Sequence, residues 1–217
     1  MVRPIAALLA ADRPRSRTAS IGDALFRWPL SPHEREQSAV GDPLSPLFDD
    51  ASNFDLRHLT TLADVSRLSA ALRRRGYRVV LTNGSFDLLH CGHSMYLERA
   101  RSFGDFLIVG VDSDDKVRER KGPNRPVVPE LERLQMLCFQ RAVGAVFLKR
   151  PEHKQWTLAR HAKPDVLVVT AETYSSEGVE RLRRRLRCQV EVLDRMATVS
   201  TTARVRAAQM AGAVPLF

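Results

Sequence analysis

The sequence predicts an α/β protein built on a five-stranded parallel sheet. Short apolar runs rich in β-branched residues alternate with helical patterns, and the run at 106–111 (FLIVGV) is apolar throughout, as in strands buried on both faces. One helical pattern separates this run from the run at 78–81, which is the βαβ arrangement. The predicted strands are 78–81, 106–111, 145–148, 166–169 and 190–193.

The chain divides into an N-terminal extension, 1–53, and a domain, 54–217. Residues 1–53 mix Pro, Arg, Ser and Asp without periodicity, so we expect poor order there, and the sequence leaves open an irregular tail or a strap across the domain. The apolar run at 5–11 is short for a signal peptide and lacks a cleavage context, which argues against secretion. A helix at 64–75, ended by Gly76, leads into the first strand.

Composition narrows the functional classes. With 44% hydrophobic residues among 217, the chain can bury a full core, and no run is long enough to cross a membrane. Three widely spaced cysteines argue against a disulfide framework and favour the cytoplasm. The net charge of +9 favours an anionic partner. The arginines at 181–187 lack interleaved aromatic residues, so we expect a solvated helix face and no nucleic-acid binding.

The stretch 82–93 (TNGSFDLLHCGH) predicts a phosphate site, because it lies where a parallel strand gives way to a helix. The first N–H groups of a helix lack intrahelical partners and carry the positive end of its dipole. Gly84 and Gly92 allow close backbone approach, and the rings of His90 and His93 can aim N–H donors into one pocket. Zinc is disfavoured, because His90, Cys91 and His93 have no distant fourth ligand.

A second phosphate cradle is predicted near the C-terminus, at 195–204 (RMATVSTTAR). Hydroxyl side chains there precede the apolar positions of a closing helix, and Arg195 adds a fixed charge. An ordinary Ser/Thr helix cap is the alternative, and it is by itself the commoner explanation of such hydroxyls.

Together these motifs resemble the HxGH nucleotidyltransferases, a family with a Rossmann-like sheet that includes glycerol-3-phosphate cytidylyltransferase and the adenylyltransferase domain of ADP-heptose synthase. The resemblance implies His90, His93 and Lys121 as catalytic residues. It implies nucleotide contacts from Thr82, Asn83, Gly84, Ser85, Phe86, Gly92, His93, Arg195, Ser200, Thr201 and Thr202. It implies substrate contacts from Asp87, Lys121, Arg133 and Glu172.

The family resemblance also implies a reaction. A phosphate oxygen of a sugar or polyol phosphate attacks the α-phosphorus of a nucleoside triphosphate, and pyrophosphate leaves. Mg²⁺ is expected through the nucleotide phosphates, with no metal ligand from the protein, and a homodimer is expected. The strings TNGSFDLLHCGH, KGPNRPV and STT are most similar to the adenylyltransferase of ADP-heptose synthase, which acts on heptose 1-phosphate.

One stretch departs from the family pattern. Residues 170–174 (TAETY) replace a Gly-Asp-Asp-Trp or Gly-Gly-Asp-Tyr string, and their side chains narrow backbone approach. Two alternatives therefore stand beside the adenylyltransferase. One is a cytidylyltransferase for glycerol 3-phosphate or another small phosphate. The other is a catalytically weak nucleotide-binding or interaction module.

Overall fold

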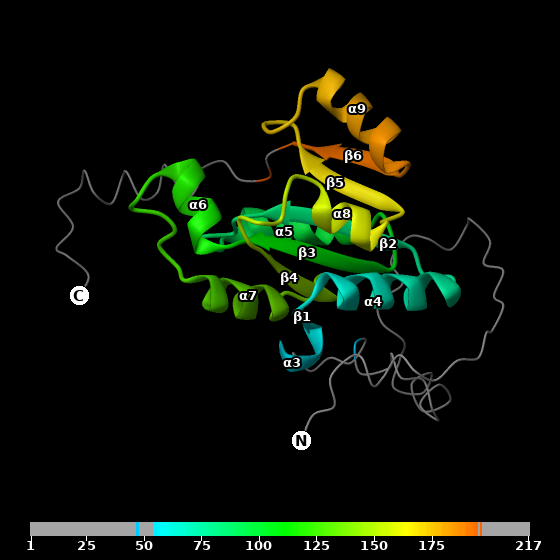
Figure 1. The fold of residues 1–217 in the computed structure, drawn as a ribbon, viewed down its shortest axis with the longest axis horizontal. Helices are drawn as coiled ribbons and strands as arrows, with labels where there is room; N and C mark the ends of the chain where they lie inside the picture. Colours follow the sequence, from blue (N-terminus) through cyan, green and yellow to red (C-terminus); the bar gives the residue numbers. More distant parts are fainter. Residues whose placement is uncertain (1–46, 48–53, 195, 197–217) are drawn as a thin grey trace.

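Six parallel strands form one sheet in the order β1-β4-β3-β2-β5-β6 (Figure 1). The computed structural model describes Leu47, residues 54–194 and Met196. The strands are β1 (His58–Leu59), β2 (Val79–Gly84), β3 (Phe106–Asp112), β4 (Ala145–Lys149), β5 (Val166–Thr170) and β6 (Gln189–Leu193). The five predicted strands are confirmed. The sequence missed β1, because two residues are too few to show a period.

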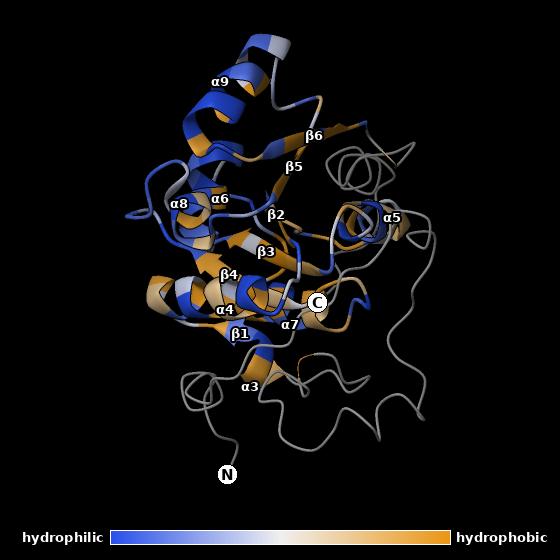
Figure 2. Ribbon diagram, turned by 90° about the vertical axis from the view of Figure 1, so that its right-hand side faces the viewer, coloured by the Kyte–Doolittle hydropathy of each residue, from blue (hydrophilic) through white to orange (hydrophobic). Residues whose placement is uncertain are grey.

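Helices cover both faces of the sheet (Figure 2). They are α3 (Phe54–Arg57), α4 (Leu62–Arg74), α5 (Cys91–Arg101), α6 (Asp114–Lys121), α7 (Glu130–Cys138), α8 (Thr157–Ala162) and α9 (Ser176–Leu186). One core, the α4-side core, joins α3, α4, α8 and α9 to the sheet, and the other, the α5-side core, joins α5 and α7 to it. Along β2, Val79 and Leu81 enter the first core and Val80 the second, as the two-residue period of a strand requires.

The ends of α4 show how local sequence sets an element boundary. Thr61 and Asp64 form a capping box at its start. At its end Gly76 adopts φ +83, and the N–H of Tyr77 bonds to the carbonyl of Leu72 while that of Gly76 bonds to Arg73. This is a Schellman motif, which favours glycine at the left-handed position. The predicted helix and its stop at Gly76 are confirmed.

Residues 116–126, a polar stretch with Gly122 and two prolines, are predicted from the sequence to form a loop, but 116–121 fold as part of helix α6. Ser113 caps the helix by accepting from the N–H of Lys116, acidic residues occupy the first turn and basic residues the last. Only Val117 of this helix is buried. The helix is thus stabilised by its cap and by charges at its ends. Because it buries only one side chain, the sequence shows no hydrophobic periodicity that would predict it.

Leu47 ties part of the N-terminal extension to the domain. Its side chain is 3% exposed and belongs to the α4-side core. The other residues of the extension, the closing helix and the predicted cradle at 195–204 lie outside the described residues, apart from Met196, which packs against the α5-side core. Cys91, Cys138 and Cys188 are free, and within the described ranges no helix is long and apolar enough to span a bilayer.

Two glycines give opposite predictions for substitution by alanine. A Cβ at Gly144 would come within 2.6 Å of the buried Phe106 ring, whereas a Cβ at Gly178, inside α9, meets nothing closer than 3.5 Å. We expect Gly144→Ala to lower the free energy of unfolding by about 1–3 kcal/mol through overpacking. Gly178→Ala should raise it by up to about 1 kcal/mol through helix propensity. Urea titration of both variants measures this, and equal effects would contradict the packing at Phe106.

Candidate active site

The predicted phosphate loop lies at the point where the strand order reverses. From β2 the chain moves outward through β3 and β4, then crosses back to β5 on the other side of β2. Ligands of open parallel sheets bind in the crevice beyond the carboxyl ends of the strands at such a point. The loop after β2 and the turn after β5 both end at this crevice, so residues 85–93 and 171–175 share one edge of the sheet.

The two histidines of the H-x-G-H string stack on each other at the beginning of α5. Their ring centroids are 3.9 Å apart with planes inclined by 23°, and the Phe86 ring meets His93 edge-on at 5.6 Å. His90 is the N-cap residue of α5 and makes no side-chain cap hydrogen bond, while its carbonyl accepts from the N–H of His93. The structure therefore brings both predicted histidines to one helix end.

His93 is held in its neutral form. Burial lowers its pKa to about 4, the positive charges on His90 and Lys121 act in the same direction, and the Leu88 carbonyl opposes them. A neutral imidazole carries one N–H donor. At pH 7 the ring can therefore donate to a phosphoryl oxygen without gaining a charge.

The loop before the histidines is shaped by Gly84 and Phe86. A Cβ at Gly84 would approach the Phe86 ring to 2.8 Å, and Phe86 itself adopts φ +45, a region that bulky residues rarely enter. Phe86 is nevertheless buried, and its ring supports His93. The strained backbone is therefore compensated by packing that fixes the ring of a predicted catalytic residue.

Thr82 and Asn83, both predicted to contact the nucleotide, differ in their surroundings. Thr82 is fully buried, with its hydroxyl 2.7 Å from that of Tyr96 and donating to the Val168 carbonyl, so it joins β2 to α5 and β5. Asn83 is half-buried, and its Oδ1 has no hydrogen-bond partner among the described residues. That oxygen lies over Gly110, where a Cβ would meet it at 2.2 Å. Their nucleotide contacts stay predictions.

Lys121, the last residue of α6, reaches the loop from the next βα connection. Its Nζ donates to Ser85 Oγ at 2.9 Å. Burial lowers the pKa of Lys121, and the nearby cations Arg120 and Arg125 lower it further. The structure thus places Lys121 beside the histidine loop, as the family pattern implies, in a position to meet an anion bound there.

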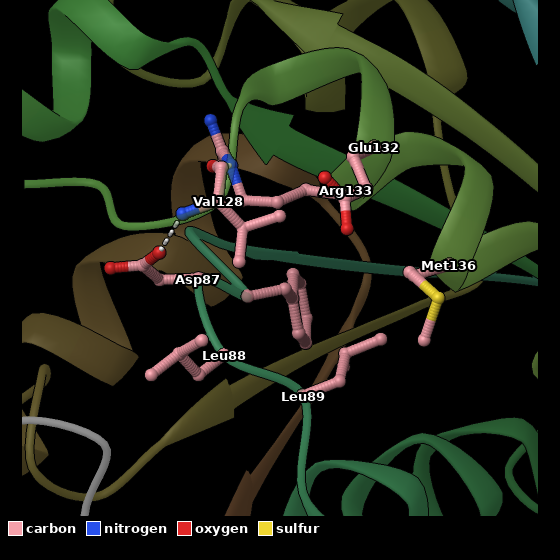
Figure 3. A pocket seen from close by; sticks show the side chains of 8 residues that line it. Asp87, Leu88, Leu89, Val128, Glu132, Arg133 and Met136 are labelled. Carbon is pink, nitrogen blue, oxygen red and sulfur yellow. Dashed lines mark hydrogen bonds between the residues drawn. The ribbon is translucent and has the colours of Figure 1, made fainter. Parts of the chain in front are cut away.

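The carboxylate of Asp87 is occupied by protein groups. It pairs with Arg125, both side chains being buried, and accepts from the N–H of Val127 at 2.8 Å. It also accepts from the N–H of Val128 at 3.0 Å, the bond drawn in Figure 3. These bonds join the histidine loop to the segment before α7. In the described structure Asp87 therefore supports the loop, and its predicted substrate contact is untested.

Arg133 is also occupied by protein groups. It is 1% exposed and donates to the carbonyls of Ser85, Asp112 and Val128 at 2.5–2.9 Å, and its Nη2 pairs with Asp114 at 2.7 Å. The sequence predicted a substrate contact here. In the described structure the guanidinium links the loop after β2 to the end of β3 and the segment before α7. The substrate contact stays a prediction.

The structure adds charged residues that the sequence reasoning missed. Asp112, buried at the end of β3, accepts from Lys149 Nζ and Arg120 Nη2, each at 2.9 Å. Asp112 and Lys149 are Cα partners in neighbouring parallel strands. A polar residue at the carboxyl end of an apolar strand was the available signal for both. Lys149 and Arg120 thus add cations to the crevice edge already lined by Lys121.

The altered turn at 170–174 borders the same edge. Thr170 and Thr173 pair through their hydroxyls at 2.8 Å, and Glu172 is exposed. Tyr174 packs against Trp156 with ring centroids 5.6 Å apart, and burial raises the pKa of Tyr174, with Asp112 acting in the same direction. The turn thus presents an aromatic pair near Asp112, and the predicted substrate contact of Glu172 stays a prediction.

The C-terminal part of the predicted site is not among the described residues. Arg195, Ser200, Thr201 and Thr202 lie outside the described residues, and β6 ends at Leu193 on the same sheet edge as the histidine loop. Within the part of the chain that the structure describes, no group of three His, Cys, Asp or Glu side chains could hold a metal.

Most of the domain is similar in sequence to a known protein family. Residues 81–208 match the cytidylyltransferase-like family. The bifunctional protein HldE of a Nitratiruptor species is 38% identical over 140 residues, covering 64% of this chain and 29% of that protein. The HldE of Koribacter versatilis is 45% identical over 121 residues, covering 56% and 24%.

A solved structure, the lipopolysaccharide core biosynthesis protein from Thermoplasma volcanium, is 26% identical with a TM-score of 0.48, covering 55% of this chain and 96% of that one. The chain spans about a quarter to a third of the length of the curated relatives it matches. The family match takes in more than half of the chain, including the whole loop that carries the stacked histidines. The chain therefore belongs to the cytidylyltransferase-like family.

Proposed function

We propose that the chain transfers a nucleoside monophosphate, AMP from ATP, to a sugar phosphate such as heptose 1-phosphate, and releases pyrophosphate. The observation that carries the proposal is the stacked His90–His93 pair at the beginning of α5, with Lys121 beside it. Family membership supports a nucleotidyltransferase. The choice of ATP and of a heptose phosphate rests on the likeness of the motifs to ADP-heptose synthase, and the relatives named as bifunctional HldE proteins are compatible with it.

The chemistry needs alignment and charge stabilisation. A phosphate oxygen of the acceptor forms a bond to the α-phosphorus while the bond to the bridging oxygen of the leaving pyrophosphate breaks. Because the nucleophile is already an anion, no general base is required, and negative charge grows on oxygens around the α-phosphorus. We assign N–H donors from His90, His93 and the first turn of α5 to these oxygens, and Lys121 to the phosphates.

Mg²⁺ enters this proposal only as the counter-ion of the triphosphate. Hard cations prefer phosphate oxygens, and the cation would reduce the charge of the leaving pyrophosphate. The buried carboxylate at the end of β3, Asp112, is engaged by Lys149 and Arg120. The described residues therefore fit a metal that arrives with the nucleotide.

Each of two alternative functions is supported by a specific observation. The family name favours a cytidylyltransferase for glycerol 3-phosphate or another small phosphate. The replacement of glycines at 170–174 favours a catalytically weak nucleotide-binding or interaction module. Pyrophosphate release with ATP, CTP, GTP and UTP against a panel of sugar and polyol phosphates separates the three, since the weak module releases none.

The ring of His93 is expected to act mainly on the rate of the chemical step. His93→Ala should lower kcat by about 100-fold or more and change nucleotide affinity only a few-fold, because the donor acts mainly in the transition state. His161→Ala is a matched control. This exposed histidine lies near the end of α8, shortly before β5 begins, and therefore at the amino ends of the strands, away from the histidine loop. Steady-state kinetics of both variants decide. Near-native turnover in His93→Ala would remove the ring from the mechanism.

His93 also predicts a pH dependence of stability. Its pKa is about 4 in the folded chain against 6.5 for an ordinary histidine, so between these values the unfolded chain binds more protons. The free energy of unfolding should therefore fall as the pH is lowered from 6.5 to 4. His93→Gln should make this fall shallower. Urea titrations at several pH values measure the difference, and parallel curves for the two proteins would contradict a buried neutral ring.

Arg195 separates a phosphate cradle from a plain helix cap in the C-terminal stretch. If it holds the β or γ phosphate, Arg195→Ala should weaken ATP binding by about 1.5–3 kcal/mol and leave AMP binding unchanged. Arg195→Lys should recover part of the loss, because lysine keeps the charge and loses the planar fork. Calorimetric titration with both nucleotides measures this. Equal losses for ATP and AMP would mean that the arginine acts through the fold.

A further inference from the structure

Cations from α6 and from the end of β4 gather around one buried carboxylate. Asp112, which ends β3, accepts from Lys149 Nζ and from Arg120 Nη2, each at 2.9 Å. Its side chain is 5% exposed, whereas those of Lys149 and Arg120 are 20% and 57% exposed, so a ligand at this edge meets the cations and not the carboxylate. Lys116 lies four residues before Arg120 in α6 and therefore on the same face of the helix. We refer to Lys116, Arg120, Lys149 and His153 as the β3–β4 cluster.

Lys116 carries a charge that its hydrogen bonds leave unneutralised. Its Nζ donates to the main-chain carbonyls of Arg150 and His153 at 3.3 and 2.8 Å, so among the described residues these bonds go to neutral groups. An ammonium has three N–H donors, so one remains for a ligand. Burial lowers the pKa of Lys116, and the charge of Lys149 lowers it further against the opposing charge of Asp112. A bound anion would therefore stabilise the ammonium.

His153 contributes a neutral donor to the cluster. Its Nδ1 accepts from the N–H of Arg150 at 3.0 Å, which leaves the ring hydrogen on Nε2. Its ring packs against that of Phe147, a buried residue of β4, with centroids 5.3 Å apart. Burial lowers the pKa of His153, and the neighbouring cation Lys116 acts in the same direction against Glu152. The ring is therefore neutral at pH 7 and carries one N–H donor.

The β3–β4 cluster borders the histidine loop on the side of β2 that faces away from β5. The strand order places β3 and β4 on one side of β2 and places β5 and β6 on the other, and the predicted C-terminal phosphate cradle follows β6 in the chain. Lys149 extends toward β2, because a Cβ at Gly110 of β3 would lie 2.8 Å from Lys149 Cδ and 2.2 Å from Asn83 Oδ1. Arg120 directly precedes Lys121, which donates to the histidine loop. The proposed phosphate site and the cluster are therefore neighbours along one edge of the sheet.

Pairing with Asp112 accounts for only part of the positive charge. One cation would neutralise the carboxylate, yet Lys149 and Arg120 both bond to it, and Lys116 adds a third charge. Glu119 of α6 also acts on Lys116, but it is exposed, and the three cations exceed the two carboxylates. A cleft lined by one sign of charge attracts ligands of the opposite sign. The cluster therefore suits an anionic group.

We infer that the β3–β4 cluster binds a second anionic group, a phosphate or a carboxylate, on the sugar phosphate that accepts the nucleotidyl group. This assignment rests on the proposed function, because that function supplies the acceptor. With the reacting phosphate beside Lys121, the rest of the sugar has the β3–β4 side of the edge available to it, and Arg120 lies between the two anion sites. Sugar phosphates with a second charge should therefore be better acceptors than those without one.

Three glucose derivatives that differ only at C6 test the inference. Glucose 1-phosphate, glucose 1,6-bisphosphate and glucuronic acid 1-phosphate carry a hydroxyl, a phosphate and a carboxylate there. Calorimetric titration of the full chain should give Kd values for the two doubly charged ligands at least about 10-fold below that for glucose 1-phosphate. The tighter binder of these two identifies the group that the cluster prefers. Equal Kd values for all three, or no binding of the bisphosphate up to about 10 mM, would overturn the inference.

Variants of α6 locate the effect. Lys116→Gln should bring the Kd values of the three ligands to within a few-fold of one another, and Lys116→Arg should keep most of the preference because it keeps the charge. Arg118→Gln is the matched control, since it removes one charge from the same helix and Arg118 pairs with the exposed Asp115. This control should bind the three ligands as wild type does. The same loss of preference in Arg118→Gln as in Lys116→Gln would overturn the assignment to the cluster.

Pyrophosphate release from ATP with the same three sugars separates this inference from the proposed function. Release at a similar kcat/KM with all three would overturn the inference and leave the nucleotidyltransferase in place. If none of the three supports release, but the binding preference is present and is lost in Lys116→Gln, the anion site stands without the reaction. The wider panel of acceptors then decides the proposed function by itself.

Discussion

The crevice edge of the sheet depends on one buried cation, Arg133. Its guanidinium donates to Ser85 in the histidine loop, to Asp112 at the end of β3, to Val128 before α7 and to Asp114 in α6. Removing one member of such a buried polar network leaves the other members unsatisfied, which costs far more than the network contributes over an apolar replacement. The buried Asp87–Arg125 pair adds a second link between the same segments. The loop that carries His90 and His93 is thus held by charges inside the protein.

These buried pairs explain why the segment between β3 and α7, although rich in lysine and arginine, contributes few free cations to the site. Arg125 and Arg133 are buried and paired, and Arg120 and Lys149 both bond to Asp112. Lys121 is different, because its described hydrogen bond goes to a neutral hydroxyl. The sequence could not distinguish these roles, because the presence of a lysine or arginine does not show whether it pairs with a protein carboxylate or is available to a ligand.

The sequence predicted the fold where a run of apolar residues marks a buried element. It predicted the site only where the site residues are close together in the chain. The apolar runs of β2, β3, β4 and β5 predicted their strands because side chains of each enter both cores, whereas β6, at the end of the strand order, alternates buried and more exposed residues. The H-x-G-H spacing sufficed to bring two histidines to one helix end. Strand β1 and helix α6 were not predicted, because β1 is only two residues long and α6 buries only Val117. The Asp112–Lys149 and Asp87–Arg125 pairs join residues 37 and 38 positions apart, and only the folded chain brings them together.

The cations of the site differ in how easily each could exchange its present hydrogen-bond partner for a phosphate oxygen. Arg133 has no exposed side-chain surface and four acceptors in fixed positions, so it cannot change partners without opening the loop. The side chain of Arg120 is 57% exposed and held by one carboxylate oxygen, so a phosphate oxygen can compete for it with Asp112. Lys121 needs only to leave a hydroxyl. Fixed cations therefore shape the loop, and in the proposed reaction the exchangeable ones, Arg120 and Lys121, are those available to a polyphosphate. The low pKa of His93 follows from the same construction, because the packed loop buries the ring and Lys121 adds positive charge beside it.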